Sequence, residues 1–145
     1  MRFGATILDA EGLRLTADEV ALFRDTNPFG FILFARNIDT PDQIRALCAD
    51  FRDAVGRDCP ITIDQEGGRV QRLRPPLARQ WLPPLEHVER AAATAHAQSD
   101  SSSNPVSRAM YLRYRLIADE LHALGIDSNC APMVDLAGVE THAFL

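Results

Sequence analysis

Short apolar runs alternate along the chain with segments of helical periodicity. The apolar runs, which predict strands, span 5–8, 30–34, 61–63 and 126–131. The run 30–34 is continuous, which is typical of a strand buried on both faces of a parallel sheet. The first three runs begin about 25 to 30 residues apart, the length of one strand–helix unit. The pattern therefore predicts an α/β fold built on a parallel sheet.

Capping signals mark the starts of two helices. Thr16 and Glu19 have the spacing of a capping box and predict a helix that runs to about residue 25. Thr40 and Gln43 form a second box, with a proline at the favoured first helical position. The second helix is expected to bury residues at helical spacing and to end at Gly56, because glycine suits the left-handed backbone of a helix terminus.

A third helix is predicted over 107–124, with Gly125 as its cap. Its buried positions are expected to be the leucines Leu112, Leu116, Leu121 and Leu124. About forty residues separate this helix from the third strand, with two Pro-Pro pairs followed by a serine-rich tract over 99–104. Connections of that length usually have a function or lack order. We expect the proline-rich half to cover a site and the serine-rich half to be mobile surface.

Composition narrows the class of protein. The 145 residues, 46% hydrophobic and 24% charged, are sufficient for one globular domain, and the net charge of −5 argues against a nucleic-acid partner. The longest apolar run, 29–35, is too short to cross a membrane, and no apolar signal-peptide segment follows Met1. A cytoplasmic location is therefore expected. The cysteines are odd in number and widely spaced, which predicts reduced, buried thiols at Cys48, Cys59 and Cys130. The histidines are scattered and do not favour a metal site.

Polar side chains follow each predicted strand. Asp9 follows the first strand, Arg36 and Asn37 the second, Asp64 the third and Asp135 the fourth. In (β/α)8 barrels the catalytic face is built from residues at several strand ends. Arg36 and Asn37 could therefore line a site, although a role in the turn is as plausible. For Asp135 a structural role is favoured.

The segment 64–72 has the highest density of polar chemistry. On one continuous strand, Asp64 and Glu66 would share a face about 6.5 to 7 Å apart, near the separation of paired glycosidase carboxylates. Alternatively, Asp64 binds sugar hydroxyls and Glu66 is structural, paired with an arginine. The planar fork of Arg72 suits sugar hydroxyls, but a salt bridge to Glu66 or to a loop carboxylate would also explain it. Gly67 and Gly68 are expected to permit positive φ or a close backbone approach.

Three segments together resemble one enzyme family. They are 64–72 (DQEGGRVQR), 30–37 (GFILFARN) and 129–136 (NCAPMVDL). They are similar to the bacterial β-N-acetylhexosaminidases of glycoside hydrolase family 3. The resemblance implies a (β/α)8 TIM barrel, of which residues 1–145 would be the N-terminal part with strands one to four, because a whole barrel needs about 250 residues. It also implies cytoplasmic hydrolysis of terminal β-linked N-acetylglucosamine from cell-wall muropeptides, in peptidoglycan recycling, by a retaining mechanism without metal or cofactor.

The resemblance assigns roles to two residues of this chain. Asp64 and Arg72 correspond to the residues that bind N-acetylglucosamine in similar enzymes, whereas the nucleophilic aspartate and the His–Asp acid/base pair belong to segments beyond residue 145. No catalytic residue is therefore expected within this chain, and substituting Asp64 is expected to leave the melting temperature nearly unchanged. Two alternatives remain: a family relative that acts on β-glucosides, and a catalytically silent fragment that at most binds saccharide weakly.

Overall fold

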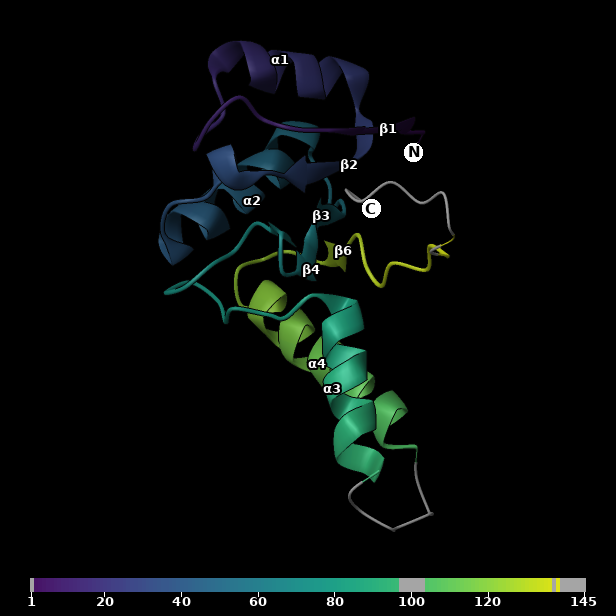
Figure 1. Cartoon of the computed structure of the whole chain (residues 1–145). Helices are drawn as coiled ribbons and strands as arrows, with labels where there is room; N and C mark the ends of the chain where they lie inside the picture. The colour runs from purple at the N-terminus through teal and green to yellow at the C-terminus, as the bar shows by residue number, and fades with distance from the viewer. Residues whose placement is uncertain (1, 97–103, 137, 139–145) are drawn as a thin grey trace.

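A computed structural model describes residues 2–96, 104–136 and 138 (Figure 1). Its main sheet contains β1 (Gly4–Leu8), β2 (Pro28–Leu33), β3 (Ile61–Ile63) and β6 (Ser128–Asn129). These strands are neighbours in that order and every pairing is parallel. The predicted α/β class and the four predicted strands are confirmed, in the strand order expected for consecutive units of a (β/α)8 barrel. The fourth strand is shorter than predicted, with two residues in place of 126–131.

Helix α1 (Ala17–Thr26) begins at the predicted capping box. The Thr16 hydroxyl accepts a hydrogen bond from the Glu19 backbone N–H at 3.2 Å, and the Glu19 carboxylate accepts one from the Thr16 N–H at 2.8 Å. Asn27, in the left-handed conformation with φ of 40°, ends the helix. Proline follows and cannot continue the helical ladder, so the chain enters β2 directly.

Helix α2 (Pro41–Val55) confirms one half of its predicted capping box. The Thr40 hydroxyl accepts from the Gln43 N–H at 3.2 Å, but the Gln43 side-chain oxygen accepts from the Asp39 N–H at 3.0 Å and not from Thr40. The amide group of Gln43 also donates to the carbonyl of Leu13 at 2.8 Å, so it ties the helix start to the preceding loop. Gly56, with φ of 64°, ends the helix as predicted.

The core lies between α1, α2 and the strands β2 and β3. Phe31 of β2 stacks on Phe51 of α2 with ring centroids 4.1 Å apart, and Phe23 of α1 meets Phe31 edge-on at 4.9 Å. All three rings are at most 2% exposed. Aromatic pairs of this geometry contribute about 0.5 to 1.5 kcal/mol beyond the burial of their area. The cluster fixes both helices on one face of the sheet.

The long connection after β3 contains two features that the sequence pattern did not predict. One is the antiparallel hairpin of β4 (Gln65–Gly67) and β5 (Val70–Gln71), and the other is helix α3 (Pro84–His96). The expectation of a loop without helix was wrong, because proline suits the first turn of a helix, where its missing N–H has no intrahelical partner. Residues 97–103, most of the serine-rich tract, lie outside the described residues.

Helix α4 (Pro105–His122) packs along α3, and the pair extends away from the sheet (Figure 1). The predicted burial of Leu112 and Leu116 was wrong, since these residues are 43% and 40% exposed. The interior row is instead Arg113, Ile117 and Leu121, with Leu124 beyond the helix. The helix cap is Ala123 rather than Gly125, which has φ of 82° and lies in the turn that leads to β6.

The three cysteines are free, but the prediction of buried thiols holds only for Cys48 and Cys59. Cys130, which follows β6, is exposed. Among the described residues, no helix combines the length and apolarity needed to cross a membrane.

Candidate functional site

The carboxyl ends of the four parallel strands lie at one edge of the sheet, and two of the predicted polar residues, Asp9 and Asp64, directly follow a strand there. Asp9 follows β1, Phe34 follows β2, Asp64 follows β3 and Cys130 follows β6. In sheets of this type ligands bind outside the carboxyl ends of the strands. This edge is therefore the candidate site.

Asp64 and Arg72, the two predicted saccharide-binding residues, form an ion pair. Arg72 Nη2 donates to Asp64 Oδ2 at 2.6 Å, and the side chains are 29% and 20% exposed. The Arg72 guanidinium also lies 5.7 Å from the centre of the Phe34 ring. Arg72 thus pairs with Asp64 and not with Glu66, the partner that the salt-bridge alternative named. The pair is sheltered enough to be ordered, and enough of it is exposed for a small ligand to reach.

The β4–β5 hairpin creates this pair, because Asp64 immediately precedes β4 and Arg72 immediately follows β5. Gln65 faces Gln71 across the hairpin. The turn uses Gly67 and Gly68, whose φ values of 104° and 63° confirm the predicted need for glycine. Asp64 lies between β3 and β4, so the assumption that Asp64 and Glu66 share one continuous strand was wrong.

Asn129 of β6 fixes the bend between β3 and β4 from the neighbouring strand. Its side-chain oxygen accepts from the Gln65 N–H at 2.9 Å, and its amide nitrogen donates to the Gln65 carbonyl at 3.0 Å. A side-chain amide thus replaces the two backbone partners that a longer β6 would supply. The backbone next to Asp64 is held by these two bonds.

Gln65 and Gln71 hold the other end of the hairpin. Gln65 is fully buried, and its side-chain oxygen accepts from the backbone N–H groups of Arg72 and Leu73, both at 3.0 Å. Gln71 donates to the carbonyls of Leu73 and Arg79 at 2.8 and 2.6 Å. The sequence reasoning did not predict these buried amides. Their only signal was the presence of amides in a charged segment directly after a buried strand.

Glu66 lies beside the pair and differs from Asp64 in its environment. Burial raises the pKa of Glu66, the charge of Asp64 raises it further, and Arg72 and Arg69 oppose the shift. Within the described part of the chain, no salt bridge to the Glu66 carboxylate is present. The predicted arginine partner for Glu66 is therefore absent from the described residues, whereas its backbone carbonyl is held by Arg113.

Cys130 is the thiol nearest the site. The residue is exposed as a whole, but partial desolvation of its sulfur, which lies 3.6 Å from the Thr62 hydroxyl, raises the pKa of the thiol. The hydrogen bond with Thr62 opposes the increase, and the Asp64 carboxylate adds to it. A thiol with a raised pKa is protonated at neutral pH and is a poor nucleophile. The arrangement does not favour Cys130 as a reacting group.

Arg36 and Asn37 serve the turn rather than the ion pair. Arg36 pairs with Asp9, and Asn37 is fully buried, with its amide group donating to the carbonyl of Ala10 at 2.9 Å. Two interpretations were left open for these residues, lining the site or stabilising the turn, and the structure supports the role in the turn. Asp135 is exposed, and its charge contributes to the raised pKa of Glu66.

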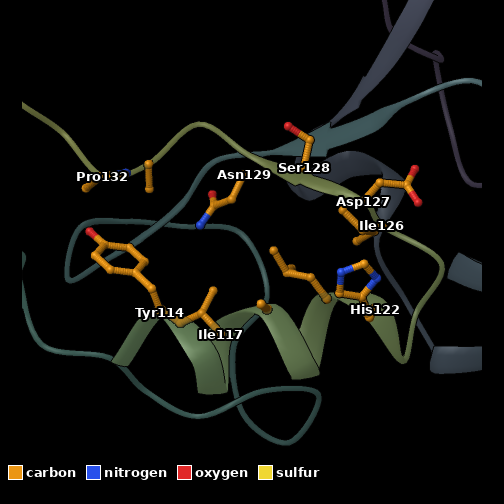
Figure 2. Close-up of a pocket in the computed structure, with 11 residues that line it drawn as sticks. Tyr114, Ile117, His122, Ile126, Asp127, Ser128, Asn129 and Pro132 are labelled. Carbon is orange, nitrogen blue, oxygen red and sulfur yellow. The ribbon is translucent and has the colours of Figure 1, made fainter. Parts of the chain in front are cut away.

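An apolar groove lies between α4 and β6 (Figure 2). Tyr114 and Ile117 line it from the helix, and Ile126 and Pro132 from the segment around β6. The polar residues His122, Asp127, Ser128 and Asn129 also line it. The groove is not assigned to the saccharide, because neither of the two predicted saccharide-binding residues, Asp64 and Arg72, reaches it. The described residues also contain no group of three or more His, Cys, Asp or Glu placed to hold a metal ion.

Comparison with protein families agrees with this geometry. A model described as "Glycosyl hydrolase family 3 N terminal domain" matches residues 6–142. The chain belongs to glycosyl hydrolase family 3. Membership confirms the resemblance read from the three sequence segments and the barrel type of the fold, since the matched region includes the four parallel strands and the hairpin.

Curated relatives in the family are named β-hexosaminidases. The protein from Pseudomonas aeruginosa is 40% identical over 133 residues, which are 92% of this chain and 36% of the relative. The protein from Methylococcus capsulatus is 36% identical over 93% of this chain and 37% of the relative. The chain thus spans about a third of the length of the curated relatives that it matches.

A solved structure has the same fold over nearly all of the chain. NagZ from Neisseria gonorrhoeae, in complex with N-trifluoroacetyl-D-glucosamine, superimposes with a TM-score of 0.78 at 30% identity. The match covers 92% of this chain and 37% of NagZ. The similarity therefore extends to a protein whose structure was solved in complex with an N-acylated glucosamine.

Proposed function

We propose that the protein containing this chain hydrolyses terminal β-linked N-acetylglucosamine, and that Asp64 and Arg72 bind the sugar. The observation that carries the proposal is the Asp64–Arg72 pair at the carboxyl edge of the sheet, joined at 2.6 Å and partly exposed. An ionised carboxylate accepts hydrogen bonds from two neighbouring hydroxyls, and a guanidinium presents several donors in a fixed plane. Together they match the alternating donors and acceptors of a sugar ring.

The pair also suits binding energetically. Each charge has its partner in the other side chain, so the two groups hold each other in position for a sugar. Holding non-reacting hydroxyls in place positions the anomeric carbon, and positioning of this kind can lower a barrier by several kcal/mol. A retaining mechanism then needs one carboxylate to attack that carbon and an acid to protonate the leaving oxygen. In this proposal both groups lie outside residues 1–145, and no metal or organic cofactor takes part.

The identity of the sugar is proposed from the relatives. Those cited are named β-hexosaminidases, and the Neisseria structure contains an N-acylated glucosamine. Both observations favour N-acetylglucosaminides over β-glucosides. The finer proposal is that the substrates are cell-wall muropeptides and that the protein works in the cytoplasm, in peptidoglycan recycling, without a nucleic-acid or membrane partner. The three free thiols suit a reducing compartment.

The test is an activity assay on the complete polypeptide encoded by the gene. We expect release of nitrophenol from 4-nitrophenyl N-acetyl-β-D-glucosaminide and little from the matching β-glucoside. Residues 1–145 alone should be inactive on both. Preference for the glucoside would favour the other branch of the family, and inactivity of the complete polypeptide would support a silent fragment. Turnover by residues 1–145, abolished by Glu66→Gln, would restore the paired-carboxylate mechanism.

A further inference from the structure

Arg113 is the largest fully buried side chain among the described residues, with 1% exposure. Within the described part of the chain it has no carboxylate partner in a salt bridge. Burying a guanidinium without a counter-charge is unfavourable unless its donors are satisfied. The Nε atom has no hydrogen-bond partner among the described residues, so the contacts of Nη1 and Nη2 show what the buried cation does.

The donors of Arg113 connect three separate segments to α4. Nη2 donates to the carbonyl of Glu66 in β4 and, at 2.7 Å, to the carbonyl of Leu82. Nη1 lies 3.3 Å from the Nδ1 atom of His87 in α3. One guanidinium thus joins the hairpin, the connection that follows it and both long helices.

Aromatic rings fix the plane of this guanidinium. The centre of the Trp81 ring is 5.5 Å from Arg113 Cζ, and the centre of the Tyr114 ring is 5.8 Å away. The indole N–H of Trp81 donates to the Glu120 carboxylate at 3.1 Å, which anchors that ring to α4. Cation–π contacts strengthen when water is excluded. The side chain is therefore held in one orientation.

The hairpin turn is shaped to receive the guanidinium. A Cβ atom at position 67 would overlap both Arg113 Nη2 and the carbonyl of Leu82. The neighbouring Gly68 donates its N–H to the Trp81 carbonyl at 2.8 Å. Gly67 thus provides close approach to Arg113 as well as positive φ, and this contact is a second reason why a side chain is excluded at position 67.

The bond to the Glu66 carbonyl lies two residues from Asp64, and Arg72 follows the opposite strand of the same hairpin. We propose that Arg113 is a positioning residue: it holds the β4–β5 hairpin against α4 so that Asp64 and Arg72 keep the geometry of the saccharide site. This role rests on the proposed function of the Asp64–Arg72 pair. Asn129 holds the hairpin from the β6 side, and Arg113 holds it from the helical side.

The first arm of the test needs no activity. Arg113→Met keeps the apolar length of the side chain but removes its donors, Arg113→Lys keeps the charge but not the fork, and Arg115→Met removes an exposed arginine from the same helix. Amide hydrogen exchange in the complete polypeptide should accelerate about tenfold or more at 65–71 in Arg113→Met, with β2 and β3 unchanged, and less in Arg113→Lys. Parental protection of 65–71 in both Arg113 variants would overturn the proposal.

The second arm measures the effect on the enzyme. On the N-acetylglucosaminide, Arg113→Met should raise KM about tenfold, with kcat within about threefold of the parent. Arg113→Lys should give a smaller increase, and Arg115→Met none. A loss of folded protein would instead lower the apparent kcat at constant KM. If Arg113→Met fails to fold, the KM of Arg113→Lys is the test. A KM equal to that of the parent would overturn the proposed positioning role. An inactive parent protein would contradict the proposed function but leave the exchange result valid.

Discussion

Replacing Asp64 by alanine should weaken both the enzyme and the fold, through separate contributions. The substitution removes the carboxylate proposed to bind the sugar, and it leaves the Arg72 guanidinium without its 2.6 Å partner. The first loss affects kcat/KM and the second affects the free energy of unfolding. The two are measured independently.

The expected loss of activity follows from hydrogen bonds to a charged group. Each contributes about 1.5 to 3 kcal/mol, and the carboxylate can accept two from neighbouring hydroxyls. A loss of about 3 to 6 kcal/mol corresponds to a decrease in kcat/KM of roughly two to four orders of magnitude.

The expected loss of stability is larger than the sequence alone predicts. An exposed ion pair contributes about 0 to 1 kcal/mol, whereas removing one partner from a fully buried pair costs about 3 to 5 kcal/mol. The Arg72 and Asp64 side chains, 29% and 20% exposed, lie between these limits. We expect a cost of about 1 to 2 kcal/mol, by interpolation between the two cases. The sequence-based expectation of a nearly unchanged melting temperature is therefore revised.

A double-mutant cycle separates the pair from its surroundings. Asp64→Ala, Arg72→Met and the double variant are compared by urea denaturation and by kcat/KM on the N-acetylglucosaminide. The double variant should be less destabilised than the sum of the single variants. Asp50→Ala, which breaks the more exposed Arg14–Asp50 pair, is the control and should leave kcat/KM unchanged. Additive stability losses, or a kcat/KM of Asp64→Ala within about threefold of the parent, would refute the reasoning.

Three further predictions follow from the same residues. Burial, and then the charge of Asp64, raise the pKa of Glu66, so the folded state binds this proton more tightly than the unfolded state does. The free energy of unfolding therefore decreases as the pH rises from about 4.3, the pKa in the unfolded chain, through the pKa of Glu66 in the folded state. Glu66→Gln should therefore flatten the melting temperature between pH 4 and 7 and raise it at pH 7; a steeper profile would contradict this. At alkaline pH, where more of its thiol is ionised despite the raised pKa, Ellman's reagent should label the exposed Cys130 in the native protein. Cys59 and Cys48 should react only after denaturation, because both are buried and burial raises the pKa of each thiol, that of Cys48 to about 12. Residues 1–145 expressed alone should aggregate, because within the described residues the outer edges of β1 and β6 have no partner strand; a monomer that melts cooperatively in light-scattering and calorimetry experiments would exclude this.

The elements predicted correctly from the sequence depend on chemistry within a few residues. The reciprocal bonds of Thr16 and Glu19 span three positions, and Gly56 adopts its left-handed conformation directly after its helix. The strands β2 and β3 were visible as apolar runs because strands of a parallel sheet that are mostly buried are rich in apolar residues. Local signals of this kind do not require knowledge of the rest of the fold.

The errors occurred where tertiary packing overrides the local pattern. Leu112 and Leu116 appeared to be the interior of α4, but Ile117 and Leu121 belong to the helical row that begins with Arg113. A buried arginine cannot be predicted from hydrophobic periodicity, because its burial depends on carbonyls from distant segments. Helix α3 was missed for a similar reason, since its opening prolines also signal loops.

The candidate site was predictable in its residues but not in its arrangement. The family resemblance indicated Asp64 and Arg72, yet the sequence did not show that they pair with each other across a hairpin. That pairing requires positive φ at Gly67 and Gly68 and the buried amide of Gln65. Each of these contacts joins groups that only the folded hairpin brings together.

The bond between Asn129 and Gln65 has a consequence for the order in which the protein folds. The two residues are 64 positions apart, so this contact at the bend that carries Asp64 forms only once β6, the last strand along the chain in this sheet, is in place. Contacts of such high sequence separation form late, after the entropy of closing a long loop has been overcome. During synthesis on the ribosome, β1, β2, α1 and α2 can pack before Asn129 emerges. The saccharide site would then be the last part of this sheet to form, after α3 and α4 have folded.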